Sequence, residues 1–78
     1  MKHKLKIEDN YLENLLDGTK RCEIRINDRD YQKDDVLEFY HWEHGLVHFG
    51  ITHIHSGLGL KEGFVALSVE RIAERTGQ

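Results

Sequence analysis

Near the start of the chain the spacing of apolar residues changes from every second residue to helical spacing, and this change constrains the fold more than any other feature of the sequence. Residues 3–7, HKLKI, place His3, Leu5 and Ile7 on one side and lysines on the other, which predicts a half-buried strand. Residues 11–16 instead place apolar side chains at helical spacing, typical of a short amphipathic helix. The period of two returns after Gly18 and recurs in segments, separated by turns and loops, up to residue 72. The pattern therefore predicts one short helix in a chain that otherwise forms strands.

Both ends of this helix carry signals. Asn10 and Glu13 have the spacing of a capping box, so we expect Asn10 to be the N-cap. Gly18 stands where a left-handed residue would end the helix. The apolar stripe of this helix comprises Tyr11, Leu12, Leu15 and Leu16.

Four further strands follow from the alternation. In the first of them we expect Cys22, Ile24 and Ile26 to be buried, opposite Glu23 and Arg25. The others are predicted over 36–42, 46–55 and 64–72, with a hairpin tip at 43–45, a loop at 57–63 and a flexible tail at 74–78. One helix after the first strand, with a mostly antiparallel sheet, predicts an α+β fold: a small, closed or nearly closed β-barrel of about five strands.

Size and composition limit the possibilities. The 78 residues suffice for one domain, 1–78, and 38% hydrophobic with 32% charged residues is typical of a globular chain. No apolar run approaches the roughly 20 residues of a membrane span, and a single cysteine suits a reducing compartment, so we expect a cytoplasmic protein. The formal net charge of −3 excludes a generally cationic surface, so any nucleic-acid site must be local.

The segment GTKRCEIR, residues 18–25, contains the candidate site. Glu23 and Arg25 share one face of a rigid strand, and Lys20 lies just before it, at the corner between helix and strand, where its side chain can fold over that face. Such a set can bind a phosphate or a polar base edge, with Glu23 accepting from an amino or amide group. The alternative is an ordinary surface ion pair that contributes about 0–1 kcal/mol.

These residues also resemble a known family. Gly18, Lys20, Glu23 and Arg25 match the G-x-K-x-x-E-x-R signature of the ASCH domain, a branch of the PUA-like superfamily. The segments H-x-L-K-I, E-I-R-x-N-D-R-D and G-L-K-E-G extend the resemblance to small uncharacterised bacterial and phage ASCH-like proteins. The resemblance implies a PUA-like barrel whose cleft, lined by Lys20, Glu23 and Arg25, binds RNA or a modified nucleoside.

Three more side chains are candidates for the rim of this cleft. His3 shares the apolar face of the first strand, where it either lines the pocket or is a buried imidazole bonded to a backbone carbonyl. Arg29, in the charged turn, and Lys61, in the glycine-rich loop, would add positive charge. The aromatic residues Tyr31, Tyr40 and Trp42 are candidates for stacking on bases.

A metal or cofactor is not expected. Five histidines lie between residues 41 and 55, but their spacing matches no zinc template, and hairpin histidines are usually solvated. The spacing of the glycines in 57–63 does not fit a dinucleotide loop.

Two other functions stay open. Some ASCH-like proteins are amidohydrolases of acetylated cytidine, with a threonine nucleophile where this chain has Glu23. Glu23 would act as a general base on water instead, with Lys20 as its acid partner, on a nucleoside amide or RNA. The third function is a protein-interaction module with a protein partner, which the small size and acidic balance also fit; the oligomeric state is not predicted.

Overall fold

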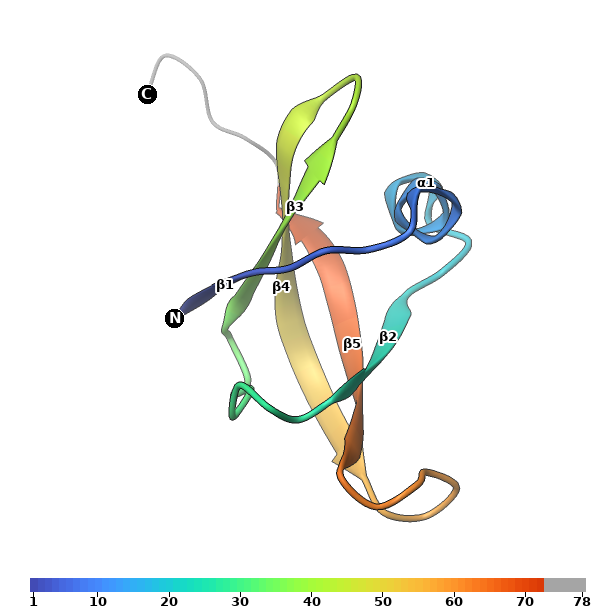
Figure 1. Ribbon diagram of the computed structural model, residues 1–78, viewed down its shortest axis with the longest axis vertical. Helices are drawn as coiled ribbons and strands as arrows, with labels where there is room; N and C mark the ends of the chain where they lie inside the picture. The colour runs from blue at the N-terminus through green and yellow to red at the C-terminus, as the bar shows by residue number, and fades with distance from the viewer. Residues whose placement is uncertain (73–78) are drawn as a thin grey trace.

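The computed structural model describes residues 1–72 (Figure 1), so the tail predicted at 74–78 lies outside the described residues. The predicted order of strands and helix is confirmed. Its elements are β1 (Lys2–Lys4), α1 (Asp9–Asp17), β2 (Cys22–Ile26), β3 (Val36–His41), β4 (Gly45–Ser56) and β5 (Phe64–Ile72). No helix among these residues is long and apolar enough to cross a membrane.

The strands form one curled five-stranded sheet in the order β1-β3-β4-β5-β2. β1 runs parallel to β3 and every other pair is antiparallel. The sheet curls into a half-barrel, and β1 and β2 are its two edge strands (Figure 1). A register shift in β4 between Ile51 and His53 bends the long strand pair β4–β5. The predicted α+β class, with a single short helix after the first strand, is confirmed.

The concave side of the sheet holds the core. Leu12 and Leu15 of α1 cover it, and Val65, Leu67 and Val69 of β5 are buried. The other buried apolar residues are Leu5, Tyr31, Leu37, Phe39, Val47, Phe49 and Ile51. Tyr31 is only 4% exposed, so the expectation that it could stack on a base is wrong.

The helix begins two residues earlier than predicted. Glu8 is the N-cap, because its carbonyl accepts the first intrahelical bond, from Leu12 N–H at 3.0 Å, and its side chain makes no capping bond. Asn10 therefore lies inside the helix, and the predicted capping box is wrong. The C-terminal prediction is confirmed, since Gly18 adopts the left-handed conformation at φ 84°.

The segment between β1 and α1 crosses the open side of the half-barrel (Figure 1). Leu5 N–H donates to the carbonyl of Glu38 in β3 at 3.0 Å. One residue further along this segment, the carbonyl of Lys6 accepts a hydrogen bond from Arg25 Nη2 of β2 at 2.5 Å. This segment therefore links the two sides of the sheet next to the predicted site.

Candidate functional site

Lys20, Glu23 and Arg25 form a connected ion triad. Glu23 Oε1 lies 3.0 Å from Lys20 Nζ, and Glu23 Oε2 lies 3.2 Å from Arg25 Nε. Lys20 Nζ also donates to the carbonyl of Cys22. The side chain of Glu23 is 10% exposed, against 27% for Lys20 and 21% for Arg25, so the carboxylate lies beneath two partly solvated cations. The triad carries a net charge of +1 in a chain whose formal charge is −3.

The triad lies on the concave face of β2, which reverses the sequence prediction. Glu23 and Arg25 pair with Leu67 and Val65 of β5, and these partners belong to the core. The alternating apolar residues point the other way, and Ile24 is 56% exposed. The expected burial of Cys22, Ile24 and Ile26 is therefore wrong: Ile26 is 57% exposed and Cys22 is half-buried.

The physical reason for the reversal is the position of β2 at an open edge. A charged face can lie inward there because α1 and residues 5–8 cover it only partly and the three charges satisfy one another. The guanidinium of Arg25 sits 6.0 Å from the ring of Phe39, and the ammonium of Lys20 sits 5.9 Å from the ring of Tyr11. Charge compensation thus replaces the apolar contact that periodicity predicts.

Two grooves of about 360 and 400 Å³ border the triad. Both are lined by Glu23, by Ile24 and by Tyr11, a residue that is 45% exposed. The first groove extends along Arg25 to the crossing segment, and the second extends to Lys20. Their volumes fall within the range of small-molecule sites.

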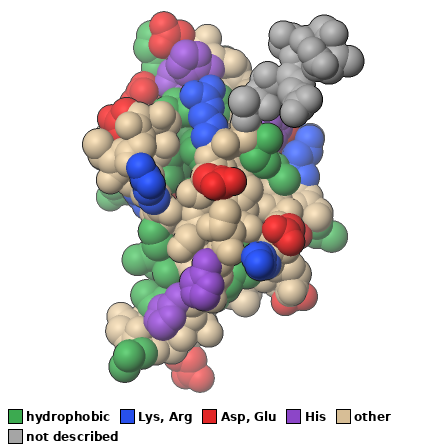
Figure 2. All heavy atoms as spheres, turned by 180° about the vertical axis from the view of Figure 1, so that it is seen from behind, with side chains coloured by type: hydrophobic (Ala, Val, Ile, Leu, Met, Phe, Trp, Pro, Cys, Tyr) green, Lys and Arg blue, Asp and Glu red, His purple; other side chains and the backbone are tan. Residues whose placement is uncertain are grey.

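Lys20 also connects the triad to a third cavity, of about 440 Å³, between the C-terminal end of α1 and strands β4 and β5. Arg21 and Arg71 line it together with the hydroxyl residues Thr52 and Ser68. Three cations therefore border this cavity, with Glu70 as its acidic residue. Elsewhere the charges are mixed: the face drawn in Figure 2 intersperses acidic and basic side chains.

His3 lies elsewhere. It is 5% exposed, its Nε2 lies 2.8 Å from Asp35 Oδ2, and its ring meets Tyr31 edge-on at 4.8 Å. Its strand, β1, forms the sheet edge opposite β2, so the expectation that His3 lines the pocket beside the triad is wrong. The alternative, a buried imidazole, is right, but a carboxylate takes the place of the expected carbonyl.

The partner of His3 is perturbed by this arrangement. The hydrogen bond from His3 lowers the pKa of the Asp35 carboxyl to about 2 from its ordinary 3.8, assisted by the Gln32 N–H and the amino group of Met1 and opposed by burial. The bonds hold together β1 and the turn before β3. Their role is to fix this corner of the fold.

Arg29 and Lys61 are exposed, in the turn after β2 and in the loop before β5. Neither is among the residues that line the two grooves beside Glu23. The structure therefore brings together Lys20, Glu23 and Arg25 out of the predicted set. Sequence reasoning missed Tyr11 and Lys6 as groove residues. The apolar stripe of α1 pointed to Tyr11 only as core, and nothing local in the sequence marks Lys6.

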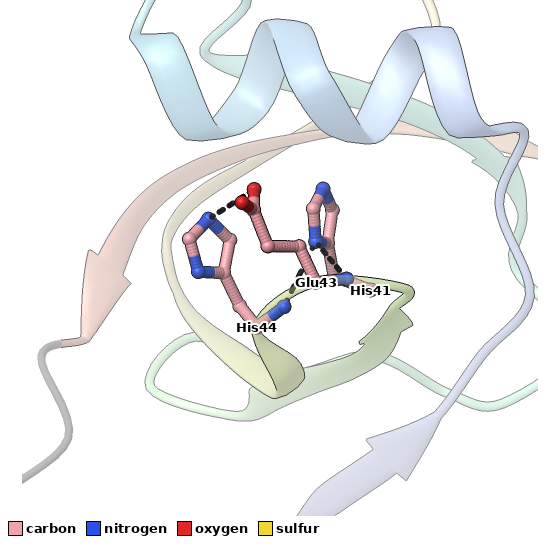
Figure 3. Close-up of side chains that lie close together, drawn as sticks. All are labelled: His41, Glu43 and His44. Atoms are coloured by element: carbon pink, nitrogen blue, oxygen red, sulfur yellow. Dashed lines mark hydrogen bonds and ion pairs between the residues drawn. The ribbon is translucent and has the colours of Figure 1, made fainter.

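The β3–β4 hairpin gathers His41, Glu43 and His44, whose ligand atoms lie within 4.8 Å of one another (Figure 3). His41 is 3% exposed, so the expectation of solvated hairpin histidines is wrong for this residue. Its Nδ1 accepts from the backbone N–H groups of Glu43 and His44 at 3.0 and 3.1 Å. In the neutral ring Nε2 then carries the proton and donates to Glu13 at 2.9 Å. Both ring nitrogens are occupied, so a cation here would have to displace one of these bonds.

The exposed side of this hairpin and its strands includes two aromatic residues and two histidines. Tyr40 and Trp42 are exposed, 68% and 69%, while Leu37 and Phe39 are buried. His53 and His55 share an exposed face of β4, since they pair with the neighbouring residues Ser68 and Ala66 two positions apart.

Residues 2–69 match the profile of a family described as a domain of unknown function, DUF3850. The chain belongs to this family. A relative of this DUF3850 domain is an uncharacterised 12.9 kDa protein of Escherichia phage P2, 36% identical over 44 residues. The match spans 56% of this chain and 40% of the phage protein, so the chain spans less than half of that relative's length.

The fold also occurs in a solved structure. The crystal structure of hypothetical protein PH0355 superposes with a TM-score of 0.68 at 20% identity, covering 92% of this chain and all of the other. At this identity the likeness concerns the fold alone.

Proposed function

We propose that this DUF3850 domain binds RNA or a modified nucleoside in the grooves beside Lys20, Glu23 and Arg25. The observation that carries the proposal is a buried carboxylate beneath two cations, at the border of grooves that also expose an aromatic ring. The resemblance of residues 18–25 to the ASCH signature supports the same ligand class.

The chemistry of the groove suits a base attached to a phosphate. The Tyr11 ring offers a π-face for stacking, worth about 1–3 kcal/mol per base in nucleic-acid sites. Glu23 accepts hydrogen bonds only, so it would pair with a ring N–H or an exocyclic amino group. The outer sides of Lys20 and Arg25 would face a phosphate.

A longer RNA would continue from the triad into the third cavity. Lys20 lines both that cavity and the groove next to Tyr11. Arg21 and Arg71 border the cavity, so a phosphate backbone laid along it would meet three cations in succession. This local cationic track would let an acidic chain bind a polyanion.

The test is an amide NMR titration with a panel of nucleosides and a short RNA, comparing wild type with Tyr11→Ala. We expect shifts clustered at residues 20–25, and a Kd raised roughly 5- to 150-fold in the variant, since one stacking contact of about 1–3 kcal/mol is lost. Tyr40→Ala is the matched control, because Tyr40 is an exposed tyrosine that lines neither groove.

Salt dependence separates the ligands within this proposal. RNA affinity should fall steeply with salt, whereas binding of an uncharged nucleoside should change little. Following nucleoside signals over hours in the same samples tests the hydrolase alternative by the appearance of product. Absence of shifts at low salt with every ligand would refute the proposal.

A further inference from the structure

The exposed apolar face of β2 is a distinctive surface feature. Ile24 and Ile26 are 56% and 57% exposed, and Cys22 beside them is half-buried. Their alternation has the pattern of a buried strand face, yet here it is open to solvent. Ala66 and Phe64, their partners on β5, are themselves only half-buried, so they extend the apolar surface inward from the edge.

The backbone of β2 is also open along this edge. Val69 N–H donates to the carbonyl of Arg21 at 3.0 Å, and Asn27 N–H donates to the carbonyl of Gly63 at 2.9 Å. In an antiparallel ladder bonded pairs alternate with non-bonded ones, so residues 21, 23, 25 and 27 face β5. The N–H and C=O groups of Cys22, Ile24 and Ile26 must point to the free edge. Lys20 confirms this direction by donating to the carbonyl of Cys22.

The two edges of the sheet are protected to different degrees: on the β2 edge Lys20 occupies the carbonyl of Cys22, whereas the opposite edge carries lysines along its exposed side. β1 carries Lys2 and Lys4 on its exposed side, the residue type that blunts edge strands against further pairing. Among residues 1–72, β2 pairs with β5 alone and carries isoleucines in the equivalent positions. The grooves that border Ile24 show that this edge is accessible.

We propose that β2 pairs with β2 of a second copy of this chain, antiparallel, about a twofold axis at Ile24. The register is set by complementarity. Centred on Ile24, it places Glu23 of each copy opposite Arg25 of the other and Cys22 opposite Ile26 of the other. The N–H of Ile24 in each copy then donates to the C=O of Ile24 in the other copy. On the concave face of this seam between the two β2 strands, opposite charges meet, and on its convex face the side chains are apolar.

A second copy fits this edge better than an arbitrary peptide because the complementarity is internal to the sequence. Shifting the axis by one residue to Glu23 or Arg25 would keep the same backbone groups at the seam but would place like charges opposite each other. A five-residue strand gives a small interface, so the dimer should be weak, with a Kd in about the micromolar to millimolar range.

This inference goes beyond the proposed function and does not depend on it. The same edge borders the grooves proposed for the ligand, so the dimer and a bound ligand would compete. The oligomeric state measured without any ligand tests the dimer alone, and its failure leaves the ligand proposal untouched.

The experiment is sedimentation equilibrium from about 10 µM to about 1 mM on wild type, Ile24→Lys and Leu46→Lys. We expect a reversible monomer–dimer equilibrium in wild type and a dimer Kd raised at least about tenfold by a lysine on the edge strand. Leu46 is the matched control, since it is 52% exposed but lies on β4 opposite Tyr40 of β3 and away from β2, so its variant should dimerise like wild type. Circular dichroism confirms that each variant is folded.

NMR on a mixture of isotope-labelled and unlabelled protein tests the register. The proposed pairing predicts an intermolecular NOE between the Hα atoms of Glu23 and Arg25, because non-bonded pairs bring these atoms closest. A monomer at 1 mM, a dimer equally stable in Ile24→Lys, or intermolecular contacts confined to another surface would each overturn the proposal.

Discussion

Glu23→Ala is the most informative substitution, because it removes the anion that holds two cations on the concave face of β2. The two ion-pair contacts, at 3.0 and 3.2 Å, are made by a carboxylate that is 10% exposed. Removing one partner of a fully buried pair costs about 3–5 kcal/mol. Lys20 and Arg25 keep 27% and 21% of their side chains in solvent, which lowers the expected loss to about 2–4 kcal/mol.

A loss of this size is a large part of the total for a domain of this length. Small domains have unfolding free energies of about 5–15 kcal/mol, and each kcal/mol shifts Tm by roughly 4–8 °C. We therefore expect Tm to fall by about 10–30 °C in Glu23→Ala. Glu23→Gln keeps the shape of the side chain and loses its charge, so its Tm should lie between those of Glu23→Ala and wild type.

Urea unfolding followed by far-UV circular dichroism measures this effect. Glu70→Ala is the control, since it removes an exposed carboxylate from β5 and should change the unfolding free energy by less than about 0.5 kcal/mol. A Glu23→Ala variant as stable as this control would refute the conclusion that the triad stabilises the fold. The sequence alone, by placing Glu23 on an exposed face, predicts that folding would survive its removal almost unchanged.

Two further predictions concern the rest of the fold. The pKa of Asp35 is about 2 in the folded protein, below its ordinary value of 3.8. The ionised carboxylate therefore stabilises the folded protein fully above pH 3.8, and this contribution is lost as the pH falls through about 2. The difference in unfolding free energy between wild type and Asp35→Asn should therefore shrink toward zero at pH 2 in a urea series; a constant difference would contradict the assignment. Gly18→Ala should destabilise by about 1–2 kcal/mol through its left-handed φ of 84° alone, since no atom of residues 1–72 lies within 4 Å of the added carbon, and Gly18→Asn should cost less in thermal melts. Equal melting of Gly18→Ala and wild type would show that the helix end rearranges.

Much of the fold could be predicted from local pattern. The period of two identified β4 and β5 as strands, and Gly18 marked the end of α1, because these features depend on neighbours along the chain. The N-terminal end of α1 was misplaced, since Asn10 and Glu13 have capping-box spacing while Glu8 provides the first carbonyl. When two possible N-cap residues lie one or two positions apart, the direction from which the preceding segment enters the helix decides which of them is used.

The sequence predicted which residues form the candidate site, but it predicted the wrong orientation for them on β2. Spacing identified Lys20, Glu23 and Arg25 as one group, and the structure joins them. Periodicity could not tell which face of β2 turns inward, because an edge strand of an open half-barrel can bury paired charges and expose isoleucines. His3 was assigned to the same site because strand order in the sheet is not encoded locally.

The sequence by itself determined the order of the elements, the single helix and the alternation that fills the core, since each depends on contacts between near neighbours. Only the tertiary structure decided that β1 and β2 are opposite edges, that His3 belongs with Asp35, and that Ile24 and Ile26 face solvent. Those outcomes depend on how strands distant in sequence pair, and a residue's own neighbours carry no record of that pairing.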